Sequence, residues 1–173
     1  MAMEQAGGGM ADGMDRWLDT LAAAADEVAR GSLGGGGCRV LGTRAGFARF
    51  PAVAHIAIIA ARPVEIGFGA SEASCEQLAR ELLQFGADEA VEPPDVADAL
   101  AELANMIAGV VKRRLAEARP DAPLAVVGLP LFVRAPVEPA PDLESVVADV
   151  VLGAEHAELF VLRRVVEEPE MLG

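Results

Sequence analysis

The chain has 173 residues, 53% of them hydrophobic and 4% aromatic, and its formal net charge at pH 7 is −13. This length predicts one domain with a sizeable core, and the negative charge argues against a nucleic-acid partner, because phosphate binding needs clustered Lys and Arg. The longest apolar stretch, residues 52–61, contains His55 and is shorter than the roughly 18–20 residues of a membrane span, so we predict no membrane association.

The cysteines and histidines predict no metal site. Cys38 and Cys75 form neither a CxxC motif nor a metal-ligand spacing, and the two histidines lie far apart in the chain. We therefore expect reduced thiols without a special role, which is typical of a cytoplasmic protein. The N-terminal residues do not show a basic segment followed by an apolar one, so no secretory signal is expected.

The first half of the chain predicts a helix followed by strands. Residues 1–13 are rich in glycine and are expected to form a disordered leader. Residues 14–30 have the apolar spacing of an amphipathic helix that ends at Gly31. The segment 31–37 (GSLGGGG) is interpreted as a flexible connection, because neither Lys-Ser/Thr nor a helix follows it as in a phosphate-binding loop. The predicted strands are 38–42, 52–61 and 64–69, with a hairpin reversal at Arg62-Pro63.

The middle of the chain predicts two helices. Residues 71–85 form the shorter one, with Ser71 as the N-cap and Gly86 as the stop. The longer one starts after Pro93-Pro94, with Asp95 as a plausible N-cap, and runs to about Ala118.

The last part of the chain predicts further strands. They cover 123–133, 144–153 and 156–166, with a proline-rich connection at 134–142 between the first two and a frayed tail at 168–173. The order of elements is roughly two copies of a helix followed by antiparallel strands. We therefore predict a single α+β domain over residues 14–167, with a mostly antiparallel sheet and long helices packed on one side.

The long helix has two distinct faces when it is placed on a wheel. One side carries an apolar stripe typical of a helix packed on a core: Val96, Leu100, Leu103, Ile107, Val110 and Val111. The opposite side carries Asp98, Glu102, Asn105, Gly109 and Lys112, the last of which is the only lysine, as Asn105 is the only asparagine. From spacing alone, Glu102 and Asn105 could be ordinary solvated surface. Asp98 and Lys112 could simply complement the two ends of the helix dipole.

The string "DALAELANMIAGVVK", residues 98–112, resembles the signature of the CheX/CheC chemotaxis phosphatases. That family carries an acidic residue and then E-x-x-N on a long exposed helix, with a proline downstream, here Pro130. The resemblance covers residues 14–166 in element order. The first helix reads Asp15-x-x-x-Asp19-x-x-Ala22 and so lacks a second copy of the motif, which makes the chain similar to CheX rather than to two-site members.

The resemblance implies hydrolysis of the aspartyl phosphate of a CheY-like response regulator. Asn105 would orient the attacking water, and Glu102 would pair with the regulator's lysine. Asp98, Met106 and Gly109 would contact the phosphorylated receiver domain. The chain would need no cofactor of its own, because the receiver would supply Mg²⁺. It would form a homodimer in the cytoplasm.

Two alternatives remain open from the sequence. One is a non-catalytic CheX-like adaptor that binds a receiver domain or a motor component. The other is a small-molecule enzyme, which a polar pocket far from residues 98–109 would favour. The absence of a recognisable nucleophile–base pair, cofactor loop or histidine constellation argues against this second alternative.

Overall fold

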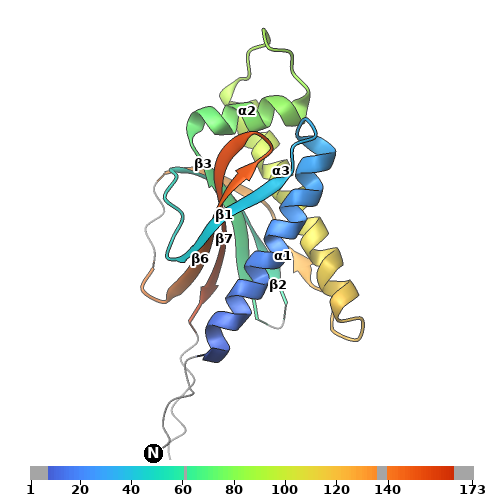
Figure 1. Cartoon of the computed structure of the whole chain (residues 1–173), viewed down its shortest axis with the longest axis vertical. Coiled ribbons are helices and arrows are strands. Elements are labelled where there is room, and N and C mark those ends of the chain that lie inside the picture. Colours follow the sequence, from blue (N-terminus) through green and yellow to red (C-terminus); the bar gives the residue numbers. More distant parts are fainter. Residues whose placement is uncertain (1–7, 61, 136–139, 166–173) are drawn as a thin grey trace, which may run out of the picture.

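The computed structural model describes residues 8–60, 62–135 and 140–165. Within these residues, three helices and seven strands follow one another as α1 (Gly8–Ser32), β1 (Cys38–Ala45), β2 (Ala52–Ile59), β3 (Val64–Ala70), α2 (Glu72–Leu83), α3 (Pro93–Ala118), β4 (Val126–Val127), β5 (Leu131–Arg134), β6 (Leu143–Leu152) and β7 (Glu155–Arg164). Figure 1 shows α1 running beside α3, while α2 crosses one end of the sheet.

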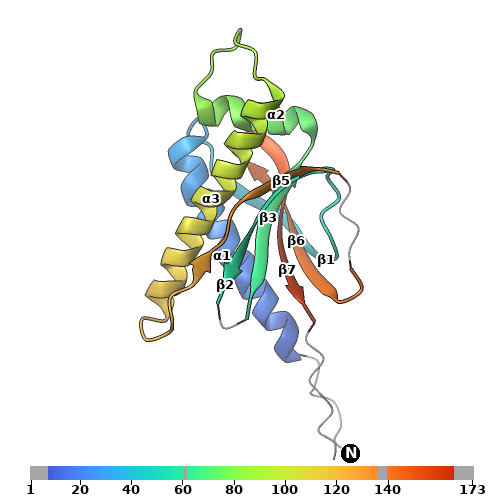
Figure 2. The same cartoon turned by 180° about the vertical axis from the view of Figure 1, so that it is seen from behind.

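The strands form one antiparallel sheet in the order β1-β6-β7-β3-β2-β4, and β5 also pairs with β2. β2 pairs with β3, and β6 pairs with β7, so each of these pairs joins strands that are consecutive in the chain. Figure 2, from behind, shows α3 on the side of the molecule away from β1, with β5 crossing the sheet between them. The predicted α+β fold with an antiparallel sheet is confirmed.

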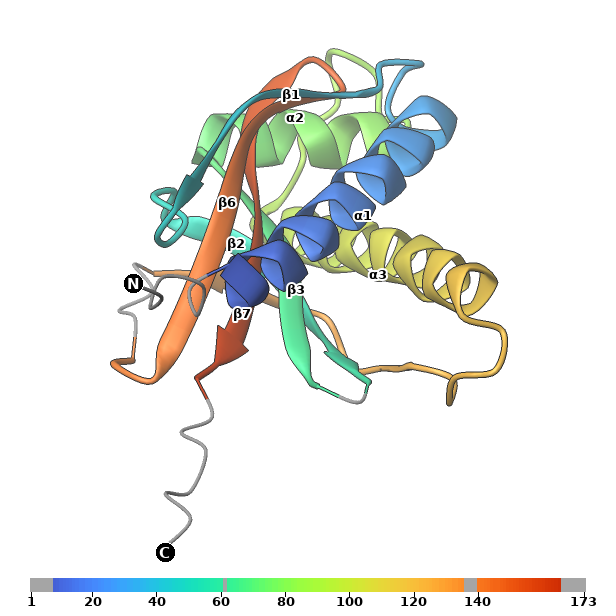
Figure 3. The ribbon, with the colours of Figure 1, turned by 60° about the horizontal axis from the view of Figure 1, so that its bottom comes forward.

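The core lies between one face of the sheet and the three helices, which share that side (Figure 3). Alternate residues of each strand point into it because side chains along a strand alternate between the two faces. The strand residues of this core include Ala54, Ile56, Ile66, Phe68, Val150 and Leu159. The helices contribute apolar side chains to this core, among them Leu21, Leu78, Leu103 and Ile107. The spacing of residues 14–30 and 96–111 predicted the stripes of α1 and α3.

The central strands are also buried on the opposite face. Val53, Val147 and Phe160 form a second, smaller apolar cluster there, and Ala48 and Leu162 pack against it. Val147 and Phe160 are only 0% and 2% exposed. The central strands are therefore buried on both sides of the sheet.

The N-terminal helix is longer than predicted. It begins at Gly8, so residues 8–13, which were assigned to a leader, are helical, and residues 1–7 lie outside the described part of the chain. Met14 is buried in the core, and no proline precedes it to stop the helix from continuing outward.

The glycine-rich segment 31–37 is a packed turn rather than a flexible connection. The carbonyl of Gly37 accepts a hydrogen bond from the backbone amide of Gly153 at 2.8 Å. A Cβ on Gly36 would lie 2.8 Å from the Cα of Gly153. Glycine is therefore needed here because two backbones approach each other closely.

The predicted boundaries of the two middle helices need correction. The N-cap of α3 is Glu92 rather than Asp95, and Pro93-Pro94 occupy the first helical positions. Proline is tolerated there because the first amides of a helix have no partner within it. Ser71 caps α2 as predicted, but the left-handed residue that ends α2 is Gln84, with φ 57°, rather than Gly86.

The single strand predicted at 123–133 is two short strands. Both β4 and β5 pair with β2, but their register differs by one residue. The break falls at Gly128–Pro130, where Leu129 is 86% exposed. Pro130 cannot donate a backbone hydrogen bond, which explains why regular pairing stops there.

Two predicted segments fall outside the described residues, wholly or in part. The tail 168–173 is not described, and neither are residues 136–139 of the proline-rich connection. Among the helices that are described, none has the length and apolar character needed to cross a bilayer.

Candidate functional site

The long helix α3 presents the predicted polar residues on its exposed face. Val96, Leu100, Leu103, Ile107 and Val111 are buried, while Asp98, Glu102, Asn105 and Gly109 are exposed. The helix is held on its buried side by α1, α2 and β2. The apolar stripe of α3 therefore packs against the core, and the E-x-x-N motif stays accessible to a partner.

Glu102 and Asn105 are in direct contact. The Nδ2 of Asn105 donates a hydrogen bond to the Oε2 of Glu102 over 3.4 Å. Residues three apart lie on adjacent turns of a helix, so both side chains stand on the same face. The result is an exposed carboxylate next to an exposed carboxamide, a pair that can bind a cation and a water molecule together.

The other predicted partner-binding residues differ in their surroundings. Asp98 is exposed one turn before Glu102. Gly109 is exposed one turn after Asn105, and a Cβ built on it would meet no atom within 4 Å. Met106 is half-buried and packs against the main core, so it borders the exposed face rather than standing fully on it.

Two arginines in the C-terminal half of α3 pair with α1. Glu27 accepts hydrogen bonds from Arg113 and from Arg114, the latter at 3.0 Å. Lys112 was interpreted as a charge that complements the end of the helix, but the last turn of α3 contains no basic residue. That interpretation is wrong, because the helix dipole acts only over the last turn.

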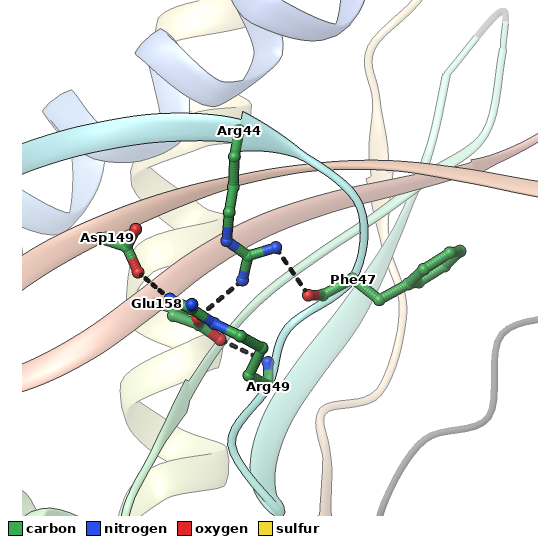
Figure 4. Close-up of polar contacts among 5 residues, drawn as sticks. All are labelled: Arg44, Phe47, Arg49, Asp149 and Glu158. Atoms are coloured by element: carbon green, nitrogen blue, oxygen red, sulfur yellow. Dashed lines mark hydrogen bonds and ion pairs between the residues drawn. The ribbon is translucent and has the colours of Figure 1, made fainter.

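A second polar cluster lies on the sheet face opposite the helices (Figure 4). Glu158 on β7 has a side chain that is only 1% exposed. It accepts hydrogen bonds from Arg44 Nη2 at 2.7 Å, Arg49 Nε at 2.8 Å and the backbone amide of Arg49 at 2.6 Å. Burial raises the pKa of the Glu158 carboxyl, but these hydrogen bonds outweigh burial, and its pKa lies below the ordinary value.

This cluster borders an open cavity of about 430 Å³ lined in part by Arg49, Asp149, His156 and Glu158. It is a polar pocket remote from residues 98–109, which is the feature that would favour a small-molecule enzyme. However, Glu158 and Asp149 are both paired with Arg49. The charged groups are therefore used to hold the fold together, and they do not form a nucleophile–base pair.

The cysteines do not form a reactive centre. Burial raises the pKa of the Cys75 thiol to about 11, and burial together with the charge of Asp26 raises the pKa of the Cys38 thiol to about 11. Both thiols are therefore protonated at neutral pH and poorly nucleophilic. Within the described ranges, no group of three His, Cys, Asp or Glu side chains converges in a way that could hold a metal ion.

Comparison with known proteins finds similarity to chemotaxis proteins. A family model described as "Chemotaxis phosphatase CheX" matches residues 53–136, which include β2, β3, α2, α3, β4 and β5. A comparison with curated proteins found no match to the chain.

Solved structures with the same fold include three chemotaxis proteins. CheX from Desulfovibrio desulfuricans has a TM-score of 0.70 at 12% identity, covering 84% of this chain and 97% of its own. CheX from Vibrio vulnificus has a TM-score of 0.68 at 16% identity, covering 86% and 99%. A CheX–CheY–BeF3–Mg²⁺ complex from Borrelia burgdorferi has a TM-score of 0.61 at 16% identity, covering 86% and 98%.

The three helices on one face of an antiparallel sheet form an α+β domain with the same fold as these solved CheX structures. Over residues 53–136, the chain is similar to the CheX family of chemotaxis phosphatases.

Sequence reasoning located the exposed face of α3 but missed two features. The Glu158 cluster joins residues far apart in the chain, and its only signal is an acidic residue inside the apolar run 157–162. The position of Pro130 was noted, but not that it interrupts a strand next to α3.

Proposed function

We propose that this chain hydrolyses the aspartyl phosphate of a CheY-like response regulator, with Asn105 orienting the attacking water and Glu102 pairing with a lysine of the regulator. The observation that carries this proposal is the contact between Glu102 and Asn105 on the exposed face of α3. The match to the family model supports the reaction class, and the neighbour solved as a CheX–CheY complex supports a receiver domain as the partner.

An acyl phosphate is labile, so the reaction needs little beyond a water molecule placed in line with the bond that breaks. The water oxygen forms a bond to phosphorus, and the bond between phosphorus and the regulator's aspartyl oxygen breaks. The electron pair leaves with the aspartyl carboxylate, and the water's proton passes to the phosphate or the solvent. Asn105 supplies orientation only, since a carboxamide neither gains nor loses a proton at neutral pH.

The remaining parts of the proposal concern the partner and the assembly. The receiver supplies the Mg²⁺ that neutralises the phosphoryl group, and this chain holds no cofactor. The protein acts in the cytoplasm as a homodimer. The unpaired outer edge of β1, where Val40 and Leu41 are 45% and 47% exposed, offers one surface for a second copy. Sedimentation equilibrium would measure the oligomeric state, and a monomer at all concentrations would contradict the dimer.

The decisive experiment replaces Asn105 with Ala and measures phosphate release from the phosphorylated regulator. We expect N105A to lose the acceleration while it still binds a regulator carrying a beryllofluoride mimic of the phosphate. Its fold should not suffer, because alanine is a better helix former than asparagine. The matched control is Q77A, which removes an exposed carboxamide from α2 and should leave the rate unchanged.

The same assay separates the phosphatase from the adaptor. A wild-type rate of phosphate release in N105A would contradict the proposed mechanism. If the wild-type protein binds the regulator of its host but never accelerates release, the chain is a non-catalytic adaptor.

A further inference from the structure

Glu102 favours one orientation of the Asn105 carboxamide. Its Nδ2 donates to Glu102 Oε2 over 3.4 Å, and a carboxylate can only accept hydrogen bonds. Side chains of a helix lean toward its N-terminus, so Asn105 lies over the turn that carries Glu102. The opposite orientation would place Asn105 Oδ1 against a negative charge, so Glu102 favours the orientation in which Oδ1 is free.

The two ends of a carboxamide would act on a water molecule in different ways. An attacking water needs its lone pair for phosphorus and gives its hydrogens to acceptors. Asn105 Oδ1 accepts such a hydrogen, which leaves the lone pair available. The Nδ2 would instead donate to that lone pair and oppose the attack. The described residues make no hydrogen bond to Oδ1.

We propose that Glu102 is a positioning residue for the reaction, in addition to its contact with the partner. It directs Nδ2 of Asn105 away from the phosphoryl group and so presents Oδ1 to the attacking water. This inference rests on the proposed function. A carboxylate has two oxygens, so Oε2 can hold the carboxamide while Oε1 accepts from a cationic side chain of the receiver. Docking and orientation of the carboxamide then depend on the same residue.

Two substitutions separate the two roles of Glu102. E102Q removes the charge but keeps a side-chain oxygen that can accept from Asn105, whereas E102A removes both. We expect both variants to raise KM for the phosphorylated regulator. E102Q should keep kcat within about threefold of the wild type, and E102A should lower kcat by about tenfold or more. The control is E117Q, which neutralises another exposed carboxylate of α3 and should change neither constant.

An NMR measurement on the whole chain tests the contact without any enzymatic assay. Asn105 is the only asparagine, so selective ¹⁵N-asparagine labelling gives one pair of side-chain amide signals. We expect this pair to shift in E102A and to stay close to its wild-type position in E102Q. Thermal unfolding of both variants shows whether the fold is kept.

The outcomes distinguish the failure of this inference from the failure of the proposed function. Equal kcat in E102Q and E102A, or side-chain amide signals of Asn105 that do not respond to E102A, would overturn the positioning role and leave the phosphatase in place. A wild-type rate in N105A would instead overturn the proposed function, whatever the NMR signals show.

Discussion

The buried carboxylate of Glu158 accepts a hydrogen bond from the backbone amide of Arg49 at 2.6 Å. Glu158 lies on β7, and Arg49 lies in the connection between β1 and β2. The contact therefore holds that connection over the sheet face opposite the helices. Arg44 and Arg49 also neutralise the carboxylate with their side chains, which allows a charge to be buried there.

We expect the substitution Glu158→Gln to destabilise the fold. It removes the charge on which two arginines and one backbone amide converge, and the expected loss in the free energy of unfolding is about 2–3 kcal/mol. Arg49 can turn into the solvent, which limits the cost. Urea denaturation followed by circular dichroism measures the loss. The control is D149N, whose partly exposed pair with Arg49 should contribute less than about 1 kcal/mol. If E158Q loses no more than D149N, the cluster is not a stabilising feature.

The contribution of Glu158 should depend on pH in one direction. Its pKa is lowered in the folded protein from the ordinary value of 4.5. A carboxyl with a lowered pKa contributes stability that is complete above its unfolded pKa and is lost as the pH falls through its folded pKa. The difference in unfolding free energy between wild type and E158Q should therefore be constant from neutral pH to about 5 and shrink below about 4.5. Urea titrations across that range measure it, and a difference that grows on acidification would contradict the assignment.

Replacing Gly109 with Ala should affect stability and activity in opposite directions. A Cβ at this position meets nothing within the chain, so alanine should stabilise the helix by about 0.5–1 kcal/mol. The same methyl group would obstruct a receiver that approaches α3 closely, so phosphate release should slow. The control is G31A, whose Cβ also meets nothing near the end of α1. It should leave the rate unchanged. A wild-type rate in G109A would remove Gly109 from the docking surface.

Both cysteines should react slowly with alkylating reagents in the folded protein. Their thiols have a pKa of about 11, so the thiolate fraction at pH 8 is about 100-fold lower than that of a free cysteine. Mass spectrometry after timed exposure to iodoacetamide measures the rate, with the urea-unfolded chain as the reference. Labelling of native Cys75 at the rate of the unfolded chain would contradict its burial.

Local patterns in the sequence predicted most of the fold because they depend on near neighbours. The apolar spacing of residues 96–111 identified the buried side of α3, and the Gly and Pro residues separated the strands. The predicted element boundaries were wrong near prolines, because a proline can be accommodated at more than one position of a helix or strand. The pattern places Pro93-Pro94 before α3, but both fit its first turn. It predicts one strand over residues 123–133, but the register shifts near Pro130.

The candidate site could be predicted only in part for a different reason. The helical wheel placed Glu102 and Asn105 on the exposed face, as the structure does, but no spacing rule assigns a reaction to that pair. Their roles came from the family resemblance. The contact between Arg49 and Glu158 could not be predicted, because 109 residues separate them in the chain and only the completed sheet brings them together.

The pairing of Glu27 with Arg113 and Arg114 gives α3 a directional charge pattern. Arg113 and Arg114 in its C-terminal half are already engaged by α1, whereas Asp98 and Glu102 in its N-terminal half form no ion pair with the described residues. A partner with a cationic side chain is thus attracted to one half of the helix and not to the other. A partner bound in one direction along α3 would therefore differ in energy from the same partner bound in the reverse direction. The charges of the helix can favour one of these two orientations before any close contact forms.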